Sequence, residues 1–184
     1  MQLKNSETQF GVVAIFFHWL MAVLLIAMLA LGLYMVRLPV SIEKLKLYGW
    51  HKEYGMVVLV LAVLRSIWRV SNLVPELALP WWEVIAARAV HYAFYGFMFA
   101  LPITGWLITS ASGLPVSFFG LFVVPDIISS HPDLIHLFKK IHKWLGYGLI
   151  AAIVLHVGAA LKHHFIDKDD ILRRMFADGS KKFW

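Results

Sequence analysis

The amino-acid sequence predicts an all-α protein, an integral membrane four-helix bundle. The first observation is composition: of 184 residues, 60% are hydrophobic and only 15% are charged, whereas a soluble domain carries about 25% charged residues. The second is that residues 9–36, 89–125 and 144–161 contain no charged side chain. Helices of this length cross a hydrocarbon core of roughly 30 Å, so we expect the chain to span a membrane.

We expect helices at about residues 11–36, 50–70, 84–110 and 138–162. The breaks between them are marked by Pro39, Ser41, Pro75, Pro80, Gly113 and Pro115. The second helix has an uncharged centre of only residues 54–64, so Lys52 and Arg65 must pair or reach toward the membrane surfaces. Residues 114–125 are apolar and flanked by glycine and proline, which predicts an interfacial loop.

Hydropathy indicates no second domain, so we expect residues 1–184 to form a single transmembrane domain. The first apolar stretch is too long for a signal peptide, and we interpret it as a retained span. Four spans put both termini on one side, together with ten of the 17 lysines and arginines. The positive-inside rule then places both termini in the cytoplasm.

The sequence contains no cysteine. This excludes disulfides, cysteine-ligated iron–sulfur clusters and the C-x-x-C-H motif that attaches haem covalently. Membrane lipid is an expected partner, and nucleic acid is not. The side opposite the termini carries a net positive charge as well, which favours attraction of an anion to that face.

Two histidines of the last apolar stretch, His142 and His156, are fourteen residues apart. At about 100° per residue this separation is about 1400°, only about 40° short of four full turns. Both side chains therefore share one helix face and lie roughly 21 Å apart along the axis. We interpret them as ligands of two sites, one near each membrane surface.

The other helices supply a partner at each depth. His18 lies near the cytoplasmic end of the first helix and His51 at the outer end of the second. Depth therefore pairs His18 with His156, and His51 with His142. Zinc requires four ligands in a tetrahedron, whereas two trans imidazoles without a nearby cysteine or carboxylate suit the axial positions of a haem iron. A haem-free transporter or scaffold with structural histidines is the alternative from another class.

Glycine placement favours a flat cofactor between the helices. Gly32 and Gly105 each follow a histidine by fourteen residues and allow close backbone approach, although glycine in membrane helices also serves helix packing. Arg65 follows His51 by the same fourteen residues. We expect it to face the inner site, where it can pair with haem propionates.

The remaining histidines have weaker signals. His91 has no spare partner at its depth, and a hydrogen bond to a neighbour is favoured over a quinone or propionate contact. His163 and His164 lie at the cytoplasmic end of the last helix, where we expect solvated side chains. A role for His163 as proton donor to a reduced quinone stays open. His131 and His136 are expected in a loop, and their spacing argues against a zinc site.

Four lysines lie near the outer ends of the second and fourth helices: Lys52, Lys139, Lys140 and Lys143. Lysines at such places usually form an interfacial band. Their position beside the outer histidines also favours a role in steering an anion.

Several segments carry a resemblance to a known family. They are I-F-F-H-W at 15–19, H-K-E-Y-G at 51–55, A-L-P-I-T-G at 100–105, I-H-K-W-L-G-Y at 141–147, L-H-V-G-A-A-L-K-H-H-F at 155–165 and D-I-L-R-R-M at 170–175. In this order the sequence resembles the bacterial cytochrome b561 family over nearly its whole length. The resemblance implies a four-helix bundle with two b-type haems stacked between the helices. The family's iron ligands match His18, His51, His142 and His156.

The resemblance also implies a function. Some family members resemble superoxide oxidases, which take electrons from superoxide at the outer face and reduce ubiquinone, while larger relatives are membrane subunits of hydrogenases and formate dehydrogenases. This chain lacks their usual extra span, which favours a stand-alone role. We expect a multi-pass electron carrier of the bacterial inner membrane that oxidises periplasmic superoxide. The alternative is a b-type cytochrome that passes electrons between quinone and a separate redox partner protein.

Overall fold

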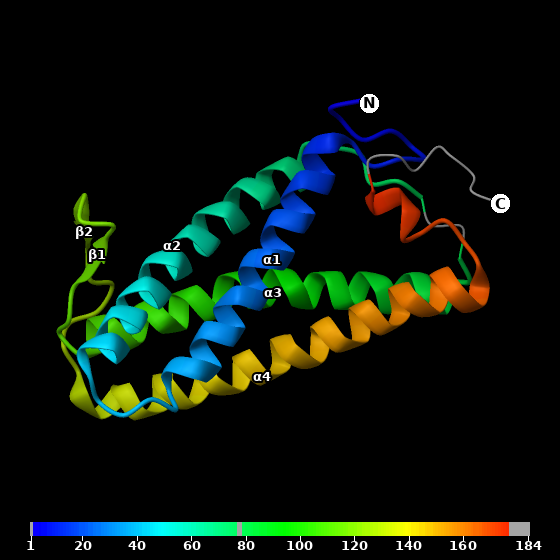
Figure 1. Ribbon diagram of the computed structural model, residues 1–184. Coiled ribbons are helices and arrows are strands. Elements are labelled where there is room, and N and C mark those ends of the chain that lie inside the picture. Colours follow the sequence, from blue (N-terminus) through cyan, green and yellow to red (C-terminus); the bar gives the residue numbers. More distant parts are fainter. Residues whose placement is uncertain (1, 77–78, 177–184) are drawn as a thin grey trace.

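The computed structural model describes residues 2–76 and 79–176; residues 1, 77–78 and 177–184 of the expected domain lie outside this description. Its helices are α1 (Val12–Met35), α2 (Ile42–Val70), α3 (Trp81–Ala111) and α4 (Pro132–Lys162), followed by a π-helical turn, η1 (His163–Asp167), and a 3-10 turn, η2 (Arg173–Met175). The four long helices form an elongated bundle (Figure 1). The predicted four-helix architecture is therefore confirmed.

Three helices begin earlier than the sequence suggested: α3 by three residues, and α2 and α4 by six or more. The start of α2 is at Ile42 because the Ser41 side chain accepts a hydrogen bond from the backbone N–H of Lys44, which caps the first turn. The start of α4 is at Pro132, a residue that needs no N–H partner in a first turn. The expectation that His136 lies in a loop is therefore wrong, since it falls inside α4.

Residues 114–125 were expected to form a loop, and this is wrong in part. Strands β1 (Val116–Phe118) and β2 (Phe122–Val124) pair as an antiparallel hairpin. Its turn contains Gly120 at a φ of 74°, a conformation that glycine adopts without steric cost. The Glu53 carboxylate accepts a hydrogen bond from the backbone N–H of Phe119, at 3.1 Å. The hairpin therefore rests on α2 at the end of the bundle opposite the N-terminus (Figure 1).

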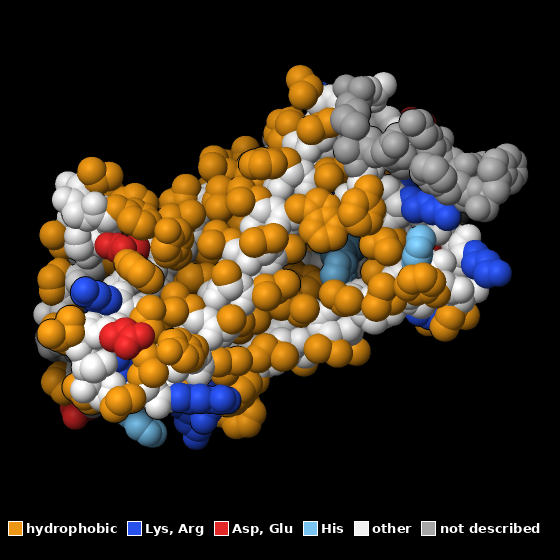
Figure 2. All heavy atoms as spheres, viewed as in Figure 1, with side chains coloured by type: hydrophobic (Ala, Val, Ile, Leu, Met, Phe, Trp, Pro, Cys, Tyr) orange, Lys and Arg blue, Asp and Glu red, His pale blue; other side chains and the backbone are white. Residues whose placement is uncertain are grey.

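The outside of the bundle is apolar. Side chains such as Phe16, Val23, Val154 and Leu155 are each more than 60% exposed, and hydrophobic groups cover the length of the visible face while charges gather toward its two ends (Figure 2). An apolar surface of this extent marks a membrane-embedded protein. By length and composition, three helical segments can cross a membrane: Val12–Met35, Trp81–Ala111 and Pro132–Asp167.

Helix α2 is less apolar than these three segments because it carries charged side chains on both sides of its uncharged centre, residues 54–64. Its 29 residues extend about 43 Å at about 1.5 Å per residue, which is ample for a bilayer core. It packs against both α1 and α3. The helix is therefore an integral part of the bundle even though composition alone does not mark it as a span.

Candidate functional site

The structure brings the four histidines together in the pairs that depth predicted. At the end near the N-terminus, His18 of α1 and His156 of α4 have ring centroids 6.0 Å apart, with planes inclined by 51°. We call this the terminal-end pair. At the other end, His51 of α2 and His142 of α4 have ring centroids 6.2 Å apart, with planes inclined by 76°. We call this the hairpin-end pair.

A buried apolar layer separates the two pairs. It contains one residue from each of the four helices: Leu25, Val58, Met98 and Leu149. Each of them lies midway between two site residues of its helix, seven positions after the first and seven positions before the second. These four side chains are between 1% and 8% exposed. A seven-residue step is about two helical turns and returns to nearly the same face. Each helix therefore presents one site position, one core residue and a second site position in register with its neighbours.

The spacing within each pair fits a shared metal. An imidazole nitrogen binds a metal at about 2.0 Å and lies about 1.15 Å from its ring centre, so two trans imidazoles on one ion have centroids about 6.3 Å apart. The observed separations are 6.0 and 6.2 Å. Among the described residues, the single convergent group of three or more metal-ligating side chains lies elsewhere. Neither pair belongs to such a group, and two imidazole ligands suit a haem rather than a tetrahedral zinc ion.

The hairpin-end pair has the close backbone approach that glycine permits. A Cβ atom added at Gly32 would lie 3.2 Å from His51 Cε1, and one added at Gly105 would lie 3.5 Å from His142 Cε1. His51 Nδ1 is buried without a hydrogen-bond partner in the described part of the chain. A buried ring nitrogen of this kind calls for a bound group or water. The residues present therefore fit a haem at this end.

His142 has a partner that sequence reasoning missed. Its Nδ1 lies 3.0 Å from the hydroxyl oxygen of Thr104, which is buried on α3. Ligating histidines usually engage their second ring nitrogen in such a contact. The signal available in the sequence was the place of Thr104 directly before Gly105, a position already assigned to the site.

His91 lies beside the terminal-end pair. Its ring centroid is 5.6 Å from that of His156, edge to face, and Phe94 approaches the same ring at 5.3 Å. The hydrogen bond expected for His91 is not among the contacts of the described residues. The reason is geometric: α3 sets the imidazole of His91 edge to face against the ring of His156, an arrangement in which the structure shows no hydrogen bond between the two rings.

The charged candidates lie toward the two ends. Arg65 is partly buried on α2, with its guanidinium 5.7 Å from the centre of the Tyr95 ring. On α4, Lys139, Lys140 and Lys143 are exposed, while Lys52 of α2 is partly buried. Exposed cations next to the hairpin-end pair retain the capacity to attract an anion.

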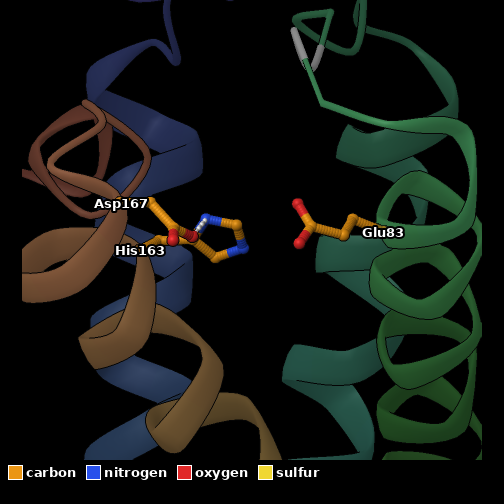
Figure 3. A group of neighbouring side chains, drawn as sticks. All are labelled: Glu83, His163 and Asp167. Atoms are coloured by element: carbon orange, nitrogen blue, oxygen red, sulfur yellow. Dashed lines mark ion pairs between the residues drawn. The ribbon is translucent and has the colours of Figure 1, made fainter.

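A network of ion pairs lies at the terminal end, and Figure 3 shows three of its residues, Glu83, His163 and Asp167, with the ion pair between His163 and Asp167. The Lys162 ammonium lies 3.0 Å from a Glu83 oxygen and 2.8 Å from an Asp167 oxygen, so it joins the start of α3 to the end of α4. His163 Nδ1 lies 3.1 Å from Asp167 and 2.7 Å from Asp169. The sequence did not indicate these carboxylates as part of a site.

The expectation that His163 and His164 are solvated is wrong. The His163 side chain is only 12% exposed, and His164 Nδ1 is buried without a hydrogen-bond partner among the described residues. The cause is the π-helical turn, which continues the chain beyond Lys162 and returns Asp167 and Asp169 onto the His163 ring.

A membrane-embedded helical bundle with two stacked imidazole pairs defines a class, the membrane cytochromes that carry electrons through b-type haem. Comparison with known proteins identifies the family within that class. The sequence model of prokaryotic cytochrome b561 matches residues 9–178. The chain belongs to this family, whose members are multi-pass proteins of the bacterial inner membrane that transfer electrons and bind b-type haem.

Three individual proteins are also similar in sequence to this chain. The chain is 37% identical over 193 residues to cytochrome b561 homolog 2 of Escherichia coli (strain K12), covering 100% of this chain and 99% of the relative. It is 41% identical to cytochrome b561 homolog 1 of the same organism over 99 residues, covering 52% and 54%. It is 31% identical over 180 residues to the probable superoxide oxidase CybB of Yersinia pestis, covering 95% and 97%.

Proposed function

We propose that the chain binds two b-type haems as one domain over residues 1–184. His51 and His142 hold one of them, and His18 and His156 hold the other. The observation that carries this proposal is the pair of ring separations, 6.2 and 6.0 Å, at the two ends of one bundle. Bound haem supplies one-electron redox chemistry, while the protein sets ligation, distance and electrostatic field.

In the membrane, we place the hairpin end in the periplasm and both termini in the cytoplasm, with α2 as the fourth span. The division of 17 lysines and arginines, ten to seven in favour of the terminal side, supports this orientation. Arg65 then lies toward the cytoplasmic side of α2, partly buried. Its planar guanidinium suits a haem propionate, which it can bind through two parallel hydrogen bonds.

The reaction we propose is superoxide oxidation coupled to ubiquinone reduction. Two superoxide ions lose one electron each and leave as dioxygen, while ubiquinone takes up both electrons and two protons and leaves as ubiquinol. Support comes from the Yersinia pestis relative, which is named a probable superoxide oxidase. Lys52, Lys139, Lys140 and Lys143 provide positive charge at the periplasmic face, and this charge attracts the anion.

The protons for ubiquinone come from the terminal end. His163 Nδ1 contacts the carboxylates of Asp167 and Asp169 at 3.1 and 2.7 Å, so it can hold a proton between two acceptors. His163 begins the π-helical turn after α4 and lies seven residues beyond His156, about 10 Å farther toward the cytoplasmic end. His91 is the second candidate for contact with quinone or propionate, because its ring lies against that of His156.

A second function keeps the haems but changes the donor. In this case the chain is a b-type cytochrome that passes electrons between quinone and a separate periplasmic redox protein. The observation in its favour is that the Escherichia coli relative with 37% identity over the whole chain carries only the cytochrome name. The exposed lysines would then dock an acidic protein surface.

Purified protein separates these possibilities in three measurements. The absorption spectrum and haem content come first, and absence of low-spin b-type bands would rule out both functions in favour of a haem-free bundle. A steady supply of superoxide is then added, with superoxide dismutase as the control. Reduction of the haem bands that dismutase abolishes, followed by reoxidation with a ubiquinone analogue, supports the oxidase. If superoxide does not reduce the haem, the oxidase is ruled out and the cytochrome that uses a separate redox partner protein is supported.

A further inference from the structure

The two histidines of the hairpin-end pair differ in the hydrogen-bond contacts of their Nδ1 atoms. His142 Nδ1 lies 3.0 Å from Thr104 Oγ1, whereas His51 Nδ1 has no hydrogen-bond partner in the described part of the structure. Thr104 is only 9% exposed. One member of the pair is therefore fixed by a buried side-chain contact, and the other is not.

The direction of the hydrogen bond follows from counting protons. The Thr104 hydroxyl lies 2.7 Å from the carbonyl oxygen of Ala100 and 2.9 Å from that of Leu101, and both oxygens can only accept. The single hydroxyl proton is used in this bond within α3, a common arrangement for threonine in helices. Thr104 Oγ1 is thus an acceptor toward His142, and Nδ1 of His142 carries the proton.

A proton on Nδ1 leaves Nε2 of His142 as the nitrogen with a free lone pair. We propose that Thr104 is a positioning residue that holds His142 in this tautomer and makes it the more basic ligand of the hairpin-end haem. The inference rests on the proposed function, since it takes His142 as an iron ligand. A more basic imidazole stabilises ferric over ferrous iron, so the hydroxyl lowers the reduction potential of that haem.

The test is a redox titration of the purified holoprotein, followed by the haem absorption bands. Thr104→Val removes the hydroxyl and keeps the shape, and Thr104→Ser restores the hydroxyl. The matched control is Thr109→Val: Thr109 is also buried on α3, and its hydroxyl also bonds to carbonyl oxygens of its own helix. His142→Ala identifies the component of the titration that belongs to the hairpin-end haem.

We expect Thr104→Val to raise the reduction potential of the hairpin-end haem alone. A tenfold change in the protein's preference for ferric over ferrous haem corresponds to about 59 mV for one electron. Thr104→Ser and Thr109→Val keep the wild-type potential. Thr104→Val can instead lose the hairpin-end haem, with an expected fall in haem affinity of about 10–100-fold. In that case, retention of this haem in both Thr104→Ser and Thr109→Val supports the proposal.

Three results would overturn the assignment: unchanged potentials in Thr104→Val, a shift in the other haem, or an equal effect of Thr104→Ser. A wild-type protein that binds no haem at the hairpin-end pair is a different result. It would remove the proposed function itself, and haem content of the wild-type protein shows this before any variant is made.

Discussion

Gly32 of α1 lies directly against His51 of α2. A Cβ atom at Gly32 would come within 3.2 Å of His51 Cε1, closer than ordinary van der Waals contact allows without movement of the ring. Movement of the ring would also change its separation from His142, 6.2 Å between centroids, which is the separation that fits a shared metal. The glycine therefore sets the position of the imidazole.

Gly32→Ala should for this reason weaken haem binding at the hairpin-end pair by about tenfold or more, as losses of supporting contacts around metal ligands do. Haem content per protein after purification measures the effect. Gly96→Ala is the control, since a Cβ atom at Gly96 meets no atom within 4 Å. Equal haem content in the two variants would contradict the role given to Gly32.

The terminal-end pair gives a second prediction, because three histidines lie there and only two are paired as ligands. His156→Ala should remove one haem of two, and so should His18→Ala, since each takes away one of two trans imidazoles. His91→Ala should keep both haems and alter only the absorption bands of one, because its ring touches His156 edge to face. Loss of a haem in His91→Ala would show that His91, not His18, is the partner of His156.

The sequence was sufficient for the pairing of the histidines because helical geometry is regular. Fourteen residues is close to four turns, so one helix carries two equivalent sites, and membrane thickness fixes their depth. The apolar layer at Leu25, Val58, Met98 and Leu149 follows from the same seven-residue step, and its burial confirms that the four helices share one register.

The contacts that depend on loops and turns could not be predicted from helical geometry. Glu83 is far in sequence from Asp167 and Asp169, and a π-helical turn with Lys168 in a left-handed conformation brings these two aspartates onto His163. The same limit applies to the hairpin, which contacts α2 through the hydrogen bond between Glu53 and Phe119 and through the rings of Tyr54 and Phe119. Neither arrangement follows from hydropathy or helical periodicity.

Arg65 allows a third prediction. A fixed positive charge favours the reduced state of a nearby redox group, which carries one more negative charge. Arg65→Gln should therefore lower the potential of the terminal-end haem by tens of millivolts, where about 59 mV corresponds to a tenfold change for one electron. Spectroelectrochemical titration measures it, with Arg69→Gln on the same helix as the control. The idea is refuted if Arg69→Gln has the larger effect.

The exposed lysines of α4 allow a fourth prediction. If Lys139, Lys140 and Lys143 attract superoxide, changing all three to glutamine should slow haem reduction by superoxide about tenfold at low ionic strength, the lower end of steering effects. Added salt should slow the wild-type protein toward the variant, because the Debye length falls to about 10 Å at 0.1 M. A control with equal loss of charge changes Arg37, Lys44 and Lys46, which lie on the same side but outside α4. Equal slowing in both triple variants would assign the effect to net charge, and no slowing would leave the lysines as an interfacial band.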